Sequence, residues 1–348
     1  MKAAVIVEPG TLEIRDVPEP RMGDYQVLVE QLACGVCTGT DAKLIAGHFK
    51  GFRTYPAVLG HEAVGRVVDR GKHVRYLRVG DVVLRAGLEQ IGDGSVHSGW
   101  GGFARYGVAG DGRAMREDGR AQPESGYLDL YQSQQTVPPT LAPAHAAMLI
   151  TYKEVLSSAY RFGFRPNASI LIYGLGPVGL TFVRFARILG LGPILAVDRH
   201  ADRRALAGVF GADECCDPTA ESPESWARHR VSAGLDFVVD AVGASDLINR
   251  AMNVVTFNGS IGVYGVAPET SMALDWAAAP YNWTLQFLQW PTFPEESATH
   301  GQVLGWVETG VVDPAKLITH VLPLDGLPEA FRLLGDRKAL KVIIDLTG

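Results

Sequence analysis

The sequence predicts an α/β protein with two domains, one built on a doubly wound parallel sheet and one made mainly of antiparallel β-strands. Between residues 148 and 290, short apolar runs alternate with helical segments in the rhythm of βαβ units. Residues 1–147 instead hold short β-type runs bounded by Gly, Pro and Asp, the pattern of an irregular antiparallel domain. At 348 residues the chain is long enough for both domains.

The N-terminal part contains most of the predicted antiparallel strands. From Ala86 to Pro139 the hydrophobic pattern fades into a stretch rich in Gly and charge, so this excursion is predicted to be a loop rather than core, with Gly101–Val108 as a strand-like island. The other predicted strands are Ala3–Val7, Gln26–Leu32, Ala63–Asp69 and Asp81–Leu84.

The C-terminal part, residues 291–348, is predicted to return to the first domain. Helical patterns at Gly301–Thr309 and Leu327–Leu334 precede a final strand at Val342–Leu346. We therefore expect one domain from residues 1–147 and 291–348, and a second from 148–290.

A glycine-rich turn follows the first strand of the second domain. Ile170–Tyr173 leads directly into Gly174, Gly176 and Gly179, which have GxGxxG spacing. The first glycine allows a tight turn, the second lets backbone approach a pyrophosphate, and the third lets the following helix pack close to its strand. Apolar residues then recur at helical spacing from Val178 to Leu189, so the amides that begin this helix would face a phosphate.

An acidic residue ends the next strand of this domain. Ile194–Val197 leads into Asp198, where a carboxylate would accept hydrogen bonds from the adenosine ribose and repel a ribose phosphate. This arrangement is typical of a Rossmann unit and favours NAD over NADP, a preference that two nearby arginines weaken without reversing. The predicted coenzyme contacts are Gly174, Gly176, Pro177, Val178, Gly179, Asp198, Arg199 and Arg203.

Metal-ligand residue types gather in the first domain. Cys37 lies in CGVCTGTD, and His61 and Glu62 lie in GHEAVG. A thiolate, an imidazole and a carboxylate are ligands that a catalytic zinc uses while leaving one position open. Singly, a cysteine is usually a small buried hydrophobe and a His beside a Glu is often a surface pair. Together, the three predict a zinc site.

The composition argues against several classes of protein. The net charge of −6, without a basic run, disfavours a nucleic-acid or membrane surface, and no stretch has the length of a membrane span. The N-terminus lacks the features of a signal peptide, and four cysteines are too few for a disulfide scaffold. We therefore expect a cytoplasmic protein.

With both sites in view, the chain resembles the zinc-dependent medium-chain alcohol dehydrogenases, in particular their polyol and threonine dehydrogenase branch. The motifs that carry the resemblance are CGVC, GHEAVG, VGDVV, GGFARY, GLGPVG, the acid at Asp198 and RKALKVIID. The resemblance implies a GroES-like catalytic domain made from both chain ends and an inserted Rossmann domain. It also implies hydride transfer between a secondary alcohol or polyol and NAD, in either direction, by a homodimer or homotetramer that contains zinc.

The resemblance assigns roles by position. Cys37 and His61 match zinc ligands, and Glu62 matches an acid that sits beside or temporarily on the metal. Val242 matches a residue that touches the coenzyme, and Lys341 stands where a basic residue often meets the pyrophosphate.

Several positions depart from the family pattern. Thr151 stands where the family has its third zinc ligand, and a neutral hydroxyl is a poor ligand. Glu154, one helical turn further on, is an alternative ligand or a surface acid beside Lys153, and Glu62 is another candidate for a permanent ligand.

The proton relay and the second zinc site of the family also differ here. Thr38 is an extra residue, so alignment on Asp41 selects Thr40 as the residue that relays the substrate proton. No cysteine occurs between Cys37 and Cys215, so the excursion lacks the ligands of the structural zinc that many members hold. Cys215 and its neighbour Cys216 are predicted to be packing residues.

Two other functions remain open at this point. The threonine at the third ligand position is compatible with a zinc-free reductase of quinones or enoyl compounds. A non-catalytic nucleotide-binding protein is the other alternative, although such a protein has no use for a metal site with an open position. The aromatic segment Tyr281–Phe293 is predicted to line the substrate pocket, fill core or form an oligomer contact.

Overall fold

The computed structural model describes residues 1–88, 94–266 and 271–348, so residues 89–93 of the predicted excursion lie outside the described part. It divides into a first unit, residues 1–153 with 293–348, and a second unit, residues 154–292. The division thus falls after Lys153 and before Phe293, whereas the sequence placed it at residues 147 and 291. Helix α3 (Pro143–Phe162) carries the chain from one unit into the other. None of the described helices combines the length and apolar character needed to cross a membrane.

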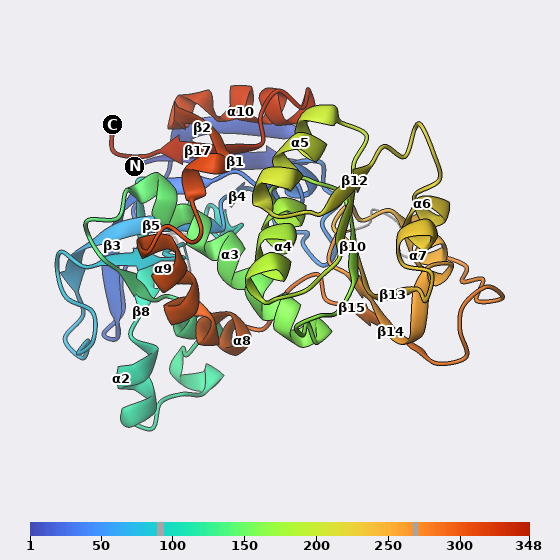
Figure 1. Ribbon diagram of the computed structural model, residues 1–348. Helices are drawn as coiled ribbons and strands as arrows, with labels where there is room; N and C mark the ends of the chain where they lie inside the picture. The colour runs from blue at the N-terminus through green and yellow to red at the C-terminus, as the bar shows by residue number, and fades with distance from the viewer. Residues whose placement is uncertain (89–93, 267–270) are drawn as a thin grey trace. The chain divides into compact units, whose positions relative to one another are not determined.

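The second unit has the predicted doubly wound parallel sheet. Its strand order is β12-β11-β10-β13-β14-β15, and each neighbouring pair is parallel. Helices α4 and α5 lie on one side of the sheet and α6 and α7 on the other (Figure 1). The elements are β10 (Ile170–Tyr173), α4 (Pro177–Ile188), β11 (Ile194–Val197), α5 (Ala201–Phe210), β12 (Glu214–Cys216), α6 (Pro223–Arg230), β13 (Leu235–Asp240), α7 (Ser245–Met252), β14 (Val255–Val263) and β15 (Trp283–Phe287).

Apolar strands and one close backbone contact hold this sheet to its helices. All four residues of β10 and all four of β11 are buried, as expected for strands covered on both faces. At Gly179 an added Cβ would lie 1.8 Å from the carbonyl oxygen of Gly174, so α4 approaches β10 as closely as only glycine allows.

The first unit contains two sheets that are mostly antiparallel. One sheet has the order β2-β1-β4-β7, and the other has β16-β17-β3-β5-β6-β9 with β8 also paired to β3. Only β4 with β7 and β16 with β17 are parallel among these described pairs. The strands are β1 (Lys2–Glu8), β2 (Thr11–Asp16), β3 (Gln26–Gly35), β4 (Ala57–Val58), β5 (Glu62–Arg70), β6 (Val82–Leu84), β7 (His97–Ser98), β8 (Tyr106–Gly110), β9 (Thr136–Val137), β16 (Ile318–Pro323) and β17 (Lys341–Asp345).

Both ends of the chain share the core of the first unit. The C-terminal strand β17 pairs antiparallel with β3, which confirms the predicted return of the final strand. Leu327 and Ala330 of α10 pack in one hydrophobic cluster with Ala4 and Ile6 of β1 and with Val342. The helices of this unit are α1 (Asp41–Ile45), α2 (Gly112–Glu117), α8 (Phe293–Ala298), α9 (His300–Glu308) and α10 (Leu327–Gly335), with short 3₁₀ turns η1 (Pro123–Ser125), η2 (Asp129–Gln132), η3 (Pro314–Lys316) and η4 (Leu324–Gly326).

The excursion after β6 is more ordered than the sequence predicted. It contains α2 and a small cluster of Met115, Tyr127 and Tyr131, all buried. Asp111 begins α2 by accepting the Ala114 amide, and its other oxygen accepts two further backbone amides at 2.7 and 2.8 Å. The prediction of a loop was wrong because tyrosines and a capping carboxylate, rather than a periodic aliphatic pattern, organise this segment.

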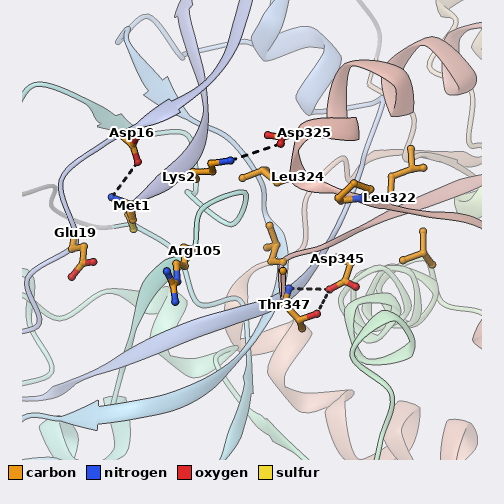
Figure 2. Close-up of a pocket in the computed structure, with 14 residues that line it drawn as sticks. Met1, Lys2, Asp16, Glu19, Arg105, Leu322, Leu324, Asp325, Asp345 and Thr347 are labelled. Atoms are coloured by element: carbon orange, nitrogen blue, oxygen red, sulfur yellow. Dashed lines mark hydrogen bonds and ion pairs between the residues drawn. The ribbon is translucent and has the colours of Figure 1, made fainter.

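A hollow of about 640 Å³ lies where the two ends of the chain meet. The Met1 ammonium lies 3.9 Å from Asp16, and the Lys2 ammonium lies 3.8 Å from Asp325 (Figure 2). No residue of the predicted metal or coenzyme site lines this hollow, and two of its acidic residues, Asp16 and Asp325, already lie close to ammonium groups of the chain. Its size is therefore no argument for a substrate site.

Candidate metal centre and coenzyme site

Strand register brings the predicted metal ligands together. In the β3–β5 ladder Gly35 lies opposite Glu62. Cys37 follows β3 by two residues and His61 precedes β5 by one, so the three side chains meet at one end of the ladder. One candidate ligand atom from each of Cys37, His61 and Glu62 lies within 4.8 Å of the others. Glu154 is not part of this group among the described residues.

The Asp41 carboxylate contacts two of these three residues, His61 and Cys37. Its Oδ1 lies 3.4 Å from Nδ1 of His61, and its Oδ2 accepts the backbone amide of Cys37 at 2.9 Å. Burial alone would lower the pKa of His61, but the hydrogen bonds to Asp41 and Cys37 outweigh burial and raise it well above its usual value. With Nδ1 turned to Asp41, the Nε2 atom faces the Glu62 carboxylate, 3.9 Å from Oε1. The sequence offered Asp41 only as an alignment anchor and missed this supporting role.

The Glu62 carboxylate is buried and held at both oxygens. The Lys341 ammonium pairs with Oε2, and the hydroxyl of Thr151 donates to Oε1 at 3.3 Å. Burial would raise the pKa of Glu62, yet the positive charge of Lys341 lowers it overall; burial lowers the pKa of Lys341, and the Glu62 charge raises it overall. Gly35 provides the space, because a Cβ there would lie 2.2 Å from Oε2. Both side chains therefore stay ionised.

The charges around this group fit a divalent cation. A bound cation requires Cys37 as a thiolate and His61 as a neutral imidazole. In that state the side chains of Cys37, Glu62 and Asp41 are the negative groups here, and Lys341 is the positive partner of Glu62. Buried charges must be paired or must coordinate metals. A soft thiolate, an imidazole and a carboxylate, with one position left for a small molecule, match the donor set of catalytic zinc. The residues present therefore fit zinc.

The structure also locates three residues whose roles were assigned by their position in the family pattern: Thr151, Thr40 and Lys341. Thr151 lies at the metal group, but as a hydrogen-bond donor to Glu62, which assigns it a use other than ligation. Thr40 is buried at the start of α1, and its hydroxyl does not cap that helix. Its assignment as the proton relay stays a prediction. The observed partner of Lys341 is Glu62, so a contact of Lys341 with pyrophosphate also stays a prediction.

The glycine turn of the second unit lies at the switch point of the sheet. The strand order reverses between β10 and β13, and Gly174 and Val242 follow these two strands. An added Cβ at Gly174 would lie 2.5 Å from Val242, so the two turns touch. Gly174 has φ +87°, a left-handed conformation that favours glycine. The buried Asp240 closes the second turn by accepting the amides of Val242 and Gly243.

The glycine turn has open space beside it and lies next to Asp198, a carboxylate that can accept further hydrogen bonds. A Cβ at Gly176 would meet nothing within 4 Å, and Pro177 and Val178, partly exposed, begin α4 beside it. Asp198 accepts the amides of Leu175 and His200 at 2.8 and 2.9 Å, which uses about two of the four acceptor sites of a carboxylate. The turn therefore has room for a phosphate at a helix N-terminus and acceptors for ribose hydroxyls. Nearby, Arg199 is exposed and Arg203 is mostly buried.

A smaller cavity of about 230 Å³ lies in the first unit beside His61. The Trp100 ring lies 5.8 Å from the His61 ring. The side chains of Leu88, Leu128, Leu130 and Trp100 give this cavity an apolar wall, and Ser98, Arg85 and Gln134 also line it. A small molecule bound here would thus place apolar groups next to the metal group.

Comparisons with known proteins show the family of this chain. The family description "Zinc-binding dehydrogenase" matches residues 177–284, and "Alcohol dehydrogenase GroES-like domain" matches residues 23–116. A probable zinc-binding alcohol dehydrogenase of Mycobacterium tuberculosis is 29% identical, over 95% of this chain and 84% of the relative. The chain belongs to the zinc-dependent medium-chain alcohol dehydrogenase family. It is an oxidoreductase of the alcohol dehydrogenase type, and its family supports zinc and a nicotinamide coenzyme.

The similarity of this dehydrogenase to other known proteins covers nearly the whole chain. The sorbitol dehydrogenase of Ovis aries is 26% identical, over 98% of this chain and 95% of its own. The solved structure of an alcohol dehydrogenase from Thermus sp. ATN1 superposes with a TM-score of 0.80 at 24% identity, over 99% of both chains. At this identity the superposition shows the fold, which is the predicted combination of GroES-like and Rossmann domains.

Asp41→Asn tests the support of His61. The amide keeps the shape of the carboxylate but loses its charge beside the histidine ring, so we expect zinc affinity to fall about 10–100-fold. Competition with a chromogenic chelator measures this change. Asp81→Asn, a turn substitution in the same unit where the side chain accepts the Arg78 amide, is the control. Equal zinc affinity of Asp41→Asn and the parent would show that Asp41 plays no part in holding the metal.

Gly176→Ala tests the coenzyme turn. Gly176 has φ −71° and open space around its Cβ position, so the variant should fold with an unchanged melting temperature. The methyl group would occupy the space of the approaching phosphate, and we expect NADH affinity to fall about 5–100-fold by titration calorimetry. Gly208→Ala in α5, which also meets nothing within 4 Å, should bind NADH like the parent. NADH binding to Gly176→Ala at parental affinity would contradict the assignment.

Proposed function

We propose that this chain is an NAD-dependent zinc dehydrogenase that transfers a hydride between a secondary alcohol or polyol and the nicotinamide ring, in either direction. The observation that supports this most directly is that Cys37, His61 and Glu62 place one candidate ligand atom each within 4.8 Å of the others, with His61 and Glu62 buried and Cys37 partly exposed. These three residues would hold zinc. When bound, zinc supplies Lewis-acid polarisation of a hydroxyl or carbonyl oxygen.

The chain's own side chains prepare the site for this reaction. Asp41 fixes the orientation of the His61 ring, and Lys341 keeps Glu62 ionised. Thr40, three residues after Cys37, is the proposed carrier of the substrate hydroxyl proton, a task typically worth about 10²–10⁴-fold in rate. The turn at Gly174 to Gly179 would bind the coenzyme pyrophosphate through backbone amides.

Asp198 supports NAD rather than NADP as the coenzyme. Its carboxylate already accepts two amides, and its remaining lone pairs suit the two ribose hydroxyls and would repel a 2′-phosphate. Of the two arginines weighed in the sequence, Arg199 is exposed and Arg203 lies 3.8 Å from Asp202. A further arginine, Arg204, donates to the Asp198 carbonyl and lies 3.0 Å from Asp217. Arg203 and Arg204 therefore both contact protein carboxylates.

The cavity beside His61 supports an alcohol with an apolar substituent as the first substrate to test. Its leucine and tryptophan side chains suit an apolar group, and Ser98, Arg85 and Gln134 are the polar side chains that line the cavity beside His61. The similarity to a sorbitol dehydrogenase supports polyols as the second class.

A zinc-free reductase is the second candidate because Thr151 replaces the third ligand. The structure weakens this reason for a zinc-free enzyme. The Thr151 hydroxyl donates a hydrogen bond to Glu62, and Glu62 is itself the third candidate metal ligand beside Cys37 and His61. A protein that only binds nucleotides would not need this set.

We also infer a homodimer or homotetramer. The edge strand β15 lies in the segment Tyr281–Phe293, and Tyr281 and Phe287 are exposed there, as is Phe257. An exposed apolar sheet edge is a ready pairing surface. Phe287→Glu should shift the parent assembly towards smaller species in sedimentation velocity, whereas Val209→Glu, an exposed site on α5, should not. A parent that sediments as a monomer would contradict the inference.

Cys37→Ser tests the proposed function as a whole. Turnover of NAD with a panel of apolar secondary alcohols and polyols is followed by NADH absorbance, on protein of measured zinc content. We expect the parent to contain zinc and the variant to lose about a thousandfold or more of kcat/KM, because Lewis-acid stabilisation is worth several kcal/mol. Cys215→Ser, a half-buried cysteine of the second unit, is the matched control. A fully active, zinc-free parent would instead establish the reductase.

A further inference from the structure

Three charged side chains form a buried ion cluster in the first unit, apart from the metal ligands. Nε of Arg85 donates to Oε1 of Glu296 at 2.8 Å, and the Lys153 ammonium lies 3.3 Å from the same oxygen. The side chains of Arg85, Lys153 and Glu296 are 2%, 0% and 1% exposed. They come from the segment after β6, from α3 and from α8, so the ion cluster joins three distant parts of the sequence.

Arg85 connects this ion cluster to the metal group. Its Nη1 donates to the backbone carbonyl of His61 at 3.1 Å. Its own backbone is held at both ends, since its amide donates to the Ala63 carbonyl and its carbonyl accepts from the Gln134 side chain. Arg85 has φ +58°, a left-handed conformation that is uncommon outside glycine and is kept only where the surroundings fix it. The guanidinium is therefore held in one place relative to His61.

Stability is a poor explanation for the ion cluster. Removing charges from water costs free energy that their attraction often fails to recover, and apolar side chains of similar volume commonly serve a buried site as well. What apolar side chains cannot do is donate a hydrogen bond to a particular carbonyl. The contact with His61 is thus the feature that requires a guanidinium.

We propose that Arg85 is a positioning residue for the metal site, and that Glu296 and Lys153 hold it in place. The inference rests on the proposed zinc-dependent function. Asp41 orients the His61 ring through Nδ1, while Arg85 fixes the peptide of the same residue through its carbonyl. Holding both the ring and the backbone restricts where Nε2 points. Through Glu296 of α8, the C-terminal part of the chain thereby contributes to the geometry of a ligand near the N-terminus.

The test separates positioning from stability with matched variants. Arg85→Met with Lys153→Met and Glu296→Leu removes the three charges together and keeps similar volumes. Arg85→Lys keeps a charge but loses the planar fork that reaches two acceptors in different directions. Asp111→Ala removes a buried acceptor of three amides and destabilises the same unit away from the metal group.

Three readouts are compared: melting temperature, rate of zinc release to a chelator, and hydrogen exchange of residues 59–64 in metal-free protein. The triple variant leaves the buried carbonyls of His61 and Ser133 without these donors, so we expect it to melt below the parent but no lower than Asp111→Ala. We also expect it to release zinc about 10–100-fold faster and to exchange about tenfold faster. Arg85→Lys should lie between the parent and the triple variant. Asp111→Ala should melt lower and release zinc at the parental rate.

Parental zinc release and parental exchange in the triple variant would overturn the proposal. If the triple variant does not fold, Arg85→Lys decides by the same two readouts. If the parent binds no zinc, the proposed function fails, but the exchange of residues 59–64 in metal-free protein still tests whether Arg85 fixes this segment. The two failures are therefore distinguishable.

Discussion

The register of β3 against β5 is the constraint on which the site depends. Because Gly35 stands opposite Glu62, the residues just beyond the two strand ends, Cys37 and His61, must meet. A slip of one residue would turn Glu62 to the other face of the sheet. Gly35 enforces the arrangement, since any side chain there would occupy the place of the Glu62 carboxylate. In this site, strand pairing brings together candidate ligands that are distant in the sequence.

Charge balance then explains which residues surround the ligands. A buried carboxylate is costly unless it is paired, and Glu62 is paired with Lys341 from the last strand of the chain. β17 reaches Glu62 because it pairs with the opposite side of β3. The first unit therefore needs both ends of the chain to complete the metal group. The second unit is inserted between these two segments in the sequence, and the segments still pair with each other in the first unit.

Much of this was predictable from the sequence because the responsible signals are local. The run from Ile170 to Asp198 contains strand, glycines, helix and acid in order, and the trio Cys37, His61 and Glu62 contains recognisable donors. The pairing of Lys341 with Glu62 and the contact of Arg85 with His61 were missed, because sequence spacing does not report which distant residue meets a buried charge. The excursion was misjudged for a related reason: its tyrosines and the capping Asp111 leave no periodic pattern.

The central claim is that one cation is shared by Cys37, His61 and Glu62. X-ray absorption at the zinc edge of the purified, zinc-loaded protein measures this most directly. We predict one sulfur neighbour at about 2.3 Å, with nitrogen and oxygen neighbours at about 2.0–2.2 Å, and loss of the sulfur signal in Cys37→Ser. A spectrum without sulfur, or one that Cys37→Ser leaves unchanged, would contradict it.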